Sequence, residues 1–429
     1  MSNYKTVFFT LGILQIILGI FMLIPIFVQF FFNEIDSSFF GASIITIIFG
    51  TLFFLSNLDH DKKLNLQQAF LLTALSWLSI AIFGSLPLIF SEVNFSFTNA
   101  FFESMSGITT TGSTIIPNLE EMPKAILLWR AILQWLGGIG IIVMATTVLP
   151  LLKVGGMQFF KTDSSGTEKI LPKTKEISIR LIYIYLSLTF TCSVIYKLCG
   201  MSFFDSFTHA MTTIATGGFL TKNASIAYFD NSSVHYIIIF FMFISGVNFS
   251  LHFRAISGDF KIYFRDLEFI AYLLIFFFIT CVIFYSISSF DDNFSVENFR
   301  ESFFATVCML TGTGFVLGDY EMWPIFVQMI ILSLMFIGGM GGSTTGGLKI
   351  IRIILLGKYT ALETRRMLHS RALIPVKIGK QLIVEDVVRN TLGYFLFFMS
   401  VFILSSLMLS SMGLNMESSI GAAASAMGN

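Results

Sequence analysis

The chain has 429 residues, of which 55% are hydrophobic, 51 are phenylalanine and only 12% are charged. An average globular protein carries about 25% charged residues, and a soluble fold has too little interior to hide this much apolar surface. The composition therefore excludes soluble domains, a secreted domain, a nucleic-acid binder and a disordered chain, while the balance of 26 basic and 26 acidic residues identifies no partner.

Nine apolar stretches are long enough to cross a bilayer core of about 30 Å, which takes about 20 helical residues. In chain order they are 6–32, 39–57, 69–91, 123–150, 177–199, 234–253, 266–289, 323–357 and 386–412. The stretch 323–357 is too long for one span and carries six glycines between Gly338 and Gly347. We expect this glycine run to interrupt the helix.

Basic residues predict the orientation of the spans, because cytoplasmic loops collect lysine and arginine. With the N-terminus in the cytoplasm, the basic residues outside the cytoplasmic segments are Lys124, Arg130, Lys197, Lys222 and Arg300. The opposite orientation would reverse this bias, so a cytoplasmic N-terminus is predicted.

Three short segments between spans share an amphipathic run followed by a cluster of glycine and threonine. The runs 94–106, 201–213 and 294–309 lead into the clusters 107–113, 214–219 and 310–315. Gly112, Gly218 and Gly314 match one another and are spaced by 106 and 96 residues. A fourth unit begins with the span 386–412 and the run 415–427 and reaches Asn429, the last residue.

Four copies of span, half-helix, loop and span indicate a fourfold pseudo-symmetric ring. Irregular backbone is tolerated at membrane depth only where it is buried in protein or lines water. The four loops are therefore expected to line one pore, with carbonyl and threonine oxygens replacing the water shell of a cation. Glycine suits such loops because it adopts backbone angles barred to other residues. Glycine-rich packing loops in another kind of carrier remain the alternative.

The predicted fold is an all-α polytopic membrane protein. Two extra N-terminal helices in 1–64 precede four pseudo-repeated helix–pore-loop–helix units around one pore, the fourth of them incomplete. The expected units are 65–176 with a filter at 108–114, 177–262 with a filter at 214–219, 263–380 with a filter at 310–315, and 381–429.

These motifs resemble the Trk/Ktr/HKT superfamily of potassium transporters, and within it the bacterial TrkH-type membrane subunit. The resemblance covers nearly the whole chain and is carried by the stretches 106–112, 134–140, 149–158, 246–249 and 338–349. It implies potassium uptake through a carbonyl-lined filter. Plant relatives with serine at the first critical position select sodium, so Gly112 favours potassium. A sodium or mixed monovalent-cation transporter of the same fold is the alternative.

The resemblance also implies site residues. Potassium would bind at the filter residues Thr110, Thr111, Gly112, Thr216, Gly217, Gly218, Gly312, Thr313, Gly314 and Asn429. The glycine run 338–347 would form an intramembrane loop below the filter that obstructs the pore as a gate, formed with its flank by Gly338, Gly339, Gly341, Gly342, Ser343, Thr344, Thr345, Gly346, Gly347 and Lys349. A flexible kink without a gating role is the alternative. Lys349 would either place positive charge at the inner mouth of the pore or anchor its helix at the lipid headgroups.

For assembly, the resemblance implies a homodimer in the bacterial cytoplasmic (inner) membrane, surrounded by lipid, with one pore per protomer. A TrkA-like cytoplasmic regulatory subunit that binds nucleotide would dock on the basic segments 153–180 and 358–385, although the bias of basic residues toward the cytoplasm explains their charge equally well. Potassium would be the transported ion, by symport or as through a channel. No covalently bound cofactor and no nucleic-acid partner are expected.

The C-terminus departs from the family pattern. In relatives the fourth filter continues beyond Gly428-Asn429 to its critical glycine and to a last span with an arginine that faces the intramembrane loop. We therefore expect the 429-residue sequence to be a fragment, with a non-conducting scaffold as the alternative.

Other motifs argue against an enzyme. The five histidines form no H-E-x-x-H, and no G-x-S-x-G is present. Two ionisable residues lie near the predicted filters. Arg130 is expected to pair with Glu103 or Glu121, and His209 is expected to serve packing.

Overall fold

A computed structural model of the protein describes residues 4–34, 36–59, 65–147, 170–368, 375–379 and 381–429. The motif 149–158 and most of the basic segment 153–180 therefore lie outside the described residues. The chain divides into two compact units, of which the first comprises Met1–Gly140 and Thr189–Asp230 and the second Ile141–Leu188 and Asn231–Asn429. Two long helices, α7 (Lys124–Thr147) and α9 (Ile170–Leu198), each contribute residues to both units.

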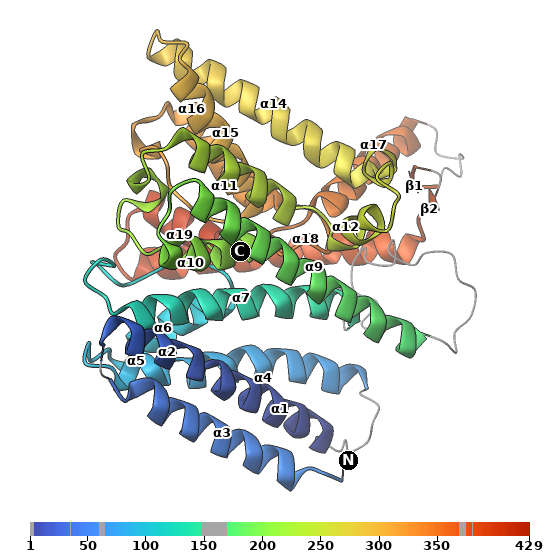
Figure 1. The fold of residues 1–429 in the computed structure, drawn as a ribbon. Helices are drawn as coiled ribbons and strands as arrows, with labels where there is room; N and C mark the ends of the chain where they lie inside the picture. Colours follow the sequence, from blue (N-terminus) through green and yellow to red (C-terminus); the bar gives the residue numbers. More distant parts are fainter. Residues whose placement is uncertain (1–3, 35, 60–64, 148–169, 369–374, 380) are drawn as a thin grey trace. The chain divides into compact units, whose positions relative to one another are not determined.

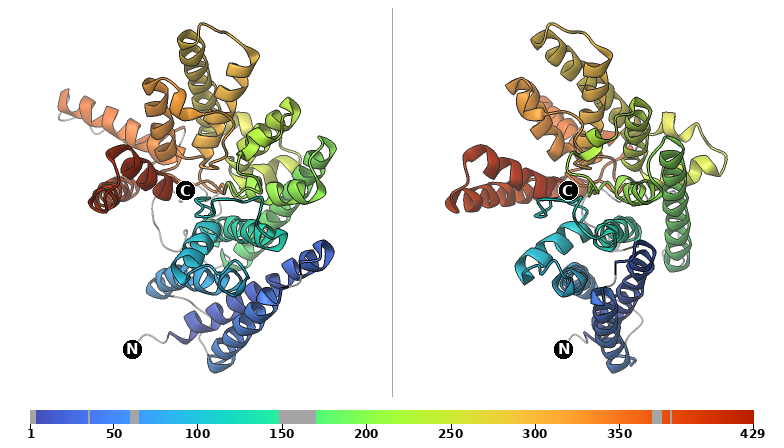
Figure 2. Two further views of the ribbon diagram at one scale, coloured as in Figure 1. Left: turned by 90° about the vertical axis from the view of Figure 1, so that its left-hand side faces the viewer. Right: turned by 60° about the vertical axis from the view of Figure 1, so that its left-hand side comes forward.

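The first unit is built from helices. Besides its parts of α7 and α9, it contains α1 (Lys5–Phe21), α2 (Leu23–Phe32), α3 (Ser38–Ser56), α4 (Leu66–Gly84), α5 (Leu86–Phe90), α6 (Phe97–Ile108), α10 (Phe203–Ile214) and the 3-10 turn η2 (Ser225–Tyr228). Helices α1, α3 and α4 lie side by side, as the blue ribbons of Figures 1 and 2 show. Its core gathers around the buried Trp129 of α7, whose indole N–H donates to the Gly84 carbonyl at 2.9 Å.

The second unit is also helical, apart from one short hairpin. It contains α11 (Ser232–Ser245), α12 (Phe249–Ile256), α13 (Ile262–Arg265), α14 (Leu267–Phe290), α15 (Val296–Thr311), the 3-10 turn η3 (Tyr320–Met322), α16 (Ile325–Ile337), α17 (Ile350–Leu368), α18 (Glu385–Ser411) and α19 (Met416–Gly428). Strands β1 (Lys377–Ile378) and β2 (Gln381–Leu382) pair antiparallel between α17 and α18. Helix α15 packs against α11 and α14, and α19 packs against α16 and α18.

Seven helical segments within the described residues are long and apolar enough to span a membrane, and an eighth forms if a bent pair counts as one span. Seven of the nine predicted spans therefore match single long helical segments, and the other two are interrupted in the structure. The predicted span 234–253 is the bent pair, α11 and α12, which meet at 98°. The stretch 323–357 is split into α16 and α17, and α16 has only 13 residues. The expected interruption at the glycine run is confirmed, because no helix covers 338–347.

Close packing of α1 on α3 depends on glycine. A Cβ added to Gly50 of α3 would lie 2.8 Å from the Ile16 backbone nitrogen and 2.9 Å from the Gly12 carbonyl oxygen. Ser43, on the same helix, donates its hydroxyl to the Gly19 carbonyl at 2.7 Å. The two helices therefore touch through their backbones, as membrane helices do where small residues line the contact.

We predict that Gly50→Ala lowers the stability of the protein by about 1–3 kcal/mol, because the added methyl group must push two backbones apart. Gly41→Ala on the same helix is the matched control, since its Cβ would meet only a Phe90 ring carbon at 4.0 Å. The control should be neutral or slightly stabilising, because alanine favours helices by about 1 kcal/mol over glycine. Thermal unfolding of the detergent-solubilised protein measures both; equal effects would contradict the close approach.

Candidate functional site

The three glycine and threonine clusters follow the same backbone course. In each, the N–H of the residue before the predicted critical glycine donates to a carbonyl five residues earlier, in the pairs Thr111 to Ser106, Gly217 to Thr212 and Thr313 to Cys308. The glycines have positive φ of 81°, 78° and 77° at Gly112, Gly218 and Gly314, and the residues two positions earlier have φ of 61°, 52° and 69° at Thr110, Thr216 and Gly312. The clusters are therefore structural repeats, each with left-handed backbone at matching positions.

Four half-helices lead into these clusters and into the end of the chain. Helices α6, α10, α15 and α19 have 12, 12, 16 and 13 residues, fewer than the roughly 20 needed to span a bilayer. Each begins after a polar residue whose side chain accepts the N–H three residues later, namely Ser96, Ser202, Ser295 and Asn415. The fourth half-helix thus has the same capped start as the other three.

Within the first unit, the first two clusters touch. A Cβ built on Gly112 would collide with the Gly217 carbonyl oxygen. The amide of Gln134, a fully buried residue of α7, donates to the same Gly217 oxygen and accepts the Phe219 N–H at 3.0 Å. One side chain therefore holds the backbone on both sides of Gly218.

A buried ion pair joins the segments that follow these two clusters. Arg130 Nε lies 2.6 Å from Glu103 Oε1, and the two side chains are 1% and 0% exposed. Glu103 also accepts the Thr114 hydroxyl at 2.9 Å and the Ile115 N–H at 3.1 Å, after the first cluster. Arg130 donates to the Leu220 carbonyl at 3.1 Å, after the second cluster. Of the two partners expected for Arg130, the structure selects Glu103.

His209 lies in the second half-helix and is fully buried. Its Nε2 accepts the Thr221 N–H at 3.4 Å, and its ring packs edge-on against Phe229. The Thr221 hydroxyl donates to Asp205 at 2.7 Å. His209 therefore supports the return of the chain after the second cluster, the packing role expected for it.

Within the second unit, the third cluster meets the end of α19 and the glycine run. A Cβ on Gly312 would lie 3.2 Å from the Gly428 carbonyl oxygen, and a Cβ on Gly346 would collide with the backbone of Asn429. The residues predicted for the third and fourth filters and for the gate are therefore close neighbours within this unit.

Backbone hydrogen bonds between the two ends of the glycine run close it into a loop. Leu348 and Lys349 donate their N–H groups to the carbonyls of Phe336 and Ile337, both at 2.9 Å, and Ile350 donates to Gly339 at 3.2 Å. The Lys349 ammonium donates back to the carbonyl and hydroxyl oxygens of Thr345. Lys349 is thereby held on the loop that precedes it.

The bend between α11 and α12 holds the tip of this loop. Met340 donates its N–H to the Gly246 carbonyl at 3.0 Å, and Phe249 donates to the Gly342 carbonyl at 3.1 Å. Asn248 caps α12 by accepting the Ser250 N–H. The stretch 246–249, which the sequence identified only as a motif, therefore binds the tip of the glycine run through backbone hydrogen bonds.

Two site residues were missed from the sequence. Gln134 was noted only as part of a motif, and no spacing rule places its amide beside a loop more than 80 residues later. Glu268 accepts two N–H groups from the glycine run and its flank. It stands at the start of an apolar span, and an ionisable residue there is a functional candidate, so this signal was available.

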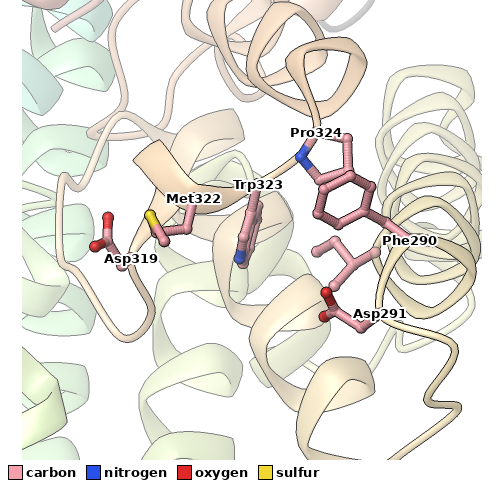
Figure 3. Close-up of a pocket in the computed structure, with 7 residues that line it drawn as sticks. Phe290, Asp291, Asp319, Met322, Trp323 and Pro324 are labelled. Carbon is pink, nitrogen blue, oxygen red and sulfur yellow. The ribbon is translucent and has the colours of Figure 1, made fainter.

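Carboxylate, imidazole and thiol groups do not gather into a metal site in the described part of the chain. A cation at the clusters would instead meet carbonyl and hydroxyl oxygens. A pocket of about 240 Å³ in the second unit is lined by Ile287, Phe290, Asp291, Asp319, Met322, Trp323 and Pro324 (Figure 3). None of these residues belongs to the predicted filter or gate.

Comparison with known proteins places the whole chain among cation transporters. The family model TrkH, described as cation transport protein, matches residues 35–429. The Trk system potassium uptake proteins TrkH of Vibrio parahaemolyticus and Escherichia coli K12 are 38% and 36% identical, over 100% and 96% of this chain and 90% and 87% of theirs. The crystal structure of the potassium transporter TrkH from Vibrio parahaemolyticus matches with a TM-score of 0.91 and 36% identity, over 99% of this chain and 89% of that one.

We predict that Arg130→Met destabilises the protein by about 3–5 kcal/mol, because it leaves the buried Glu103 carboxylate without its charge partner. Adding Glu103→Gln should recover part of this loss. Arg389→Met is the control: its pair with Asp386 is 80% and 73% exposed, and exposed pairs contribute about 0–1 kcal/mol. Thermal unfolding in detergent gives the ranking. A double variant no more stable than Arg130→Met would contradict the role assigned to the pair.

Proposed function

The chain belongs to the TrkH family of cation transport proteins, and we propose that it carries potassium into the cell across the bacterial cytoplasmic membrane. The observation that carries this proposal is the backbone shared by three glycine and threonine clusters, each at the end of a capped half-helix. The names of its relatives, which describe potassium uptake proteins, point to the same ion.

The proposed filter uses backbone carbonyl and threonine hydroxyl oxygens of the clusters as potassium ligands. The contact between the first two clusters supports this, as does the contact of the third with the end of α19. That the four loops surround one axis stays a prediction of the sequence repeat. The carbonyl ends of the half-helices carry partial negative charge, which favours a cation near them.

The proposed gate is the glycine run 338–347. Its neighbourhood supports the role, because the loop lies against Asn429 at the predicted fourth filter and has no helical structure of its own. A loop without a regular ladder moves at lower cost than a packed helix, and regions with low local stability supply the moving parts of proteins.

The remaining proposals concern assembly. The relatives are named as parts of a Trk system, which supports a cytoplasmic TrkA-like regulatory partner that binds nucleotide. A lipid-embedded homodimer with a cytoplasmic N-terminus completes the proposal. Sodium or mixed-cation transport by the same fold is the second candidate, favoured only if uptake fails to discriminate between the ions.

Potassium-uptake complementation tests the function. A bacterium without its own potassium uptake systems receives the gene for this chain, read to its stop codon, together with a matching regulatory subunit. We predict growth at low potassium and uptake of potassium in preference to sodium, neither of which occurs with the empty vector. Sodium uptake at an equal rate would support the second candidate, and no cation uptake despite membrane expression would contradict both.

Two glycine variants test the filter. We predict that Gly112→Ser abolishes discrimination between potassium and sodium, because its Cβ would displace the Gly217 carbonyl. Gly413→Ser is the matched control: it lies outside the filter, its φ is 99°, and its Cβ would meet nothing within 4 Å. Both variants carry the left-handed strain of about 1–2 kcal/mol, so the control should retain discrimination. Unchanged selectivity in Gly112→Ser would remove this cluster from the filter.

A further inference from the structure

Glu268 is a buried acid that the proposed transport function does not use. It is the second residue of α14 and is 6% exposed. Its Oε1 accepts the Gly341 N–H at 2.8 Å and the Ile351 N–H at 3.1 Å. Gly341 lies within the glycine run, whereas Ile351 lies in the first turn of α17. One oxygen atom therefore joins three elements: α14, the glycine run and α17.

The ordinary reason for an acid in the first turn of a helix does not account for this geometry. Acids there are favoured by the helix dipole and by capping of free N–H groups. The start of α14 is already capped, because the Asp266 side chain accepts the Phe269 N–H at 2.8 Å. Glu268 instead uses its carboxyl group on N–H groups that belong to other elements.

We infer that Glu268 is the latch that keeps the glycine run in its closed position, an inference that rests on the proposed gating function. The loop is held on one side by the bend between α11 and α12 and on the other by Glu268. If Gly341 leaves its place, its N–H must give up this acceptor. A buried N–H without a partner is costly, so the latch favours the closed loop.

The same oxygen also connects the loop to α17. Because Ile351 and Gly341 share one acceptor, a shift of α17 that moves Ile351 disturbs the bond to Gly341. Helix α17 continues to Leu368, into the basic segment 358–385. A partner that pulls on this segment from the cytoplasm would therefore loosen the latch, which gives the regulatory subunit a direct mechanical path to the gate.

The test measures potassium flux in liposomes that contain the purified chain without a regulatory subunit. Glu268→Ala removes the acceptor and should raise basal flux by about fivefold or more, the effect of losing roughly 1 kcal/mol of closed-state stability. Glu268→Gln keeps an oxygen that accepts both bonds and should stay close to the unmodified chain. Asp386→Ala, which removes an exposed first-turn acid of α18, is the control and should change nothing.

A second pair of variants removes the donor instead. Ile351→Pro deletes the N–H in the first turn of a helix, where proline is tolerated, and should raise basal flux as Glu268→Ala does. Ile351→Ala shortens the side chain but keeps the N–H and should raise it less. Where the unmodified chain carries potassium, basal flux that is unchanged in Glu268→Ala, or raised equally in Glu268→Gln, would overturn the latch.

A measurement that does not depend on potassium flux tests the Glu268 latch separately from the proposed transport function. Ser343 is 1% exposed in the loop, so Ser343→Cys, in a chain whose four native cysteines are serine, reports loop opening by its labelling rate with a water-soluble thiol reagent. Glu268→Ala should speed labelling and Glu268→Gln should not; equal rates would overturn the latch. If the unmodified chain carries no potassium while labelling still responds, the transport proposal fails and the latch on the loop stands.

Discussion

Backbone without a regular ladder must find partners for its N–H and C=O groups wherever lipid excludes water. Each of the three glycine and threonine clusters meets this constraint from within, through a bond to the carbonyl five residues earlier and left-handed residues that turn the chain. The glycine run satisfies its backbone groups in two ways. Its two ends hydrogen-bond to each other, and its tip hydrogen-bonds to the bend between α11 and α12. The same requirement therefore shapes the proposed filter and the proposed gate.

Gly246 shows how closely the two are built together in the second unit. A Cβ there would lie 2.9 Å from the Thr311 methyl carbon, at the end of the third half-helix, and would collide with the Tyr272 hydroxyl. The Gly246 carbonyl accepts the Met340 N–H of the glycine run. Gly246 thus packs closely against the third cluster and binds the glycine run through its carbonyl. A shift of the bend between α11 and α12 would therefore affect the cluster and the glycine run together.

The sequence predicted the features that depend on local spacing. The matching positions of Gly112, Gly218 and Gly314 share a conformation, and the interruption at 338–347 is present. The 98° bend within 234–253 was not predicted, because no proline marks it and Ser245, Gly246 and Asn248 interrupt the apolar run only briefly. The positions of Gln134 and Glu268 depend on which helices pack around a loop far along the chain, and periodicity within one segment carries no such information.

Two buried acids share one task in a chain with few charges. Glu103 accepts the Ile115 N–H beyond the first cluster, and Glu268 accepts the Gly341 N–H in the glycine run. Each carboxyl group comes from a neighbouring helix and accepts the N–H of a loop residue that has no hydrogen bond within a helix or sheet. Glu103 is held by Arg130, whereas Glu268 shares its oxygen with the Ile351 N–H. Loss of either partner of a buried ion pair strongly destabilises the protein, which suits a rigid support for the proposed filter. Two backbone donors on one oxygen can instead be released by a small shift of either element, which suits the proposed gate.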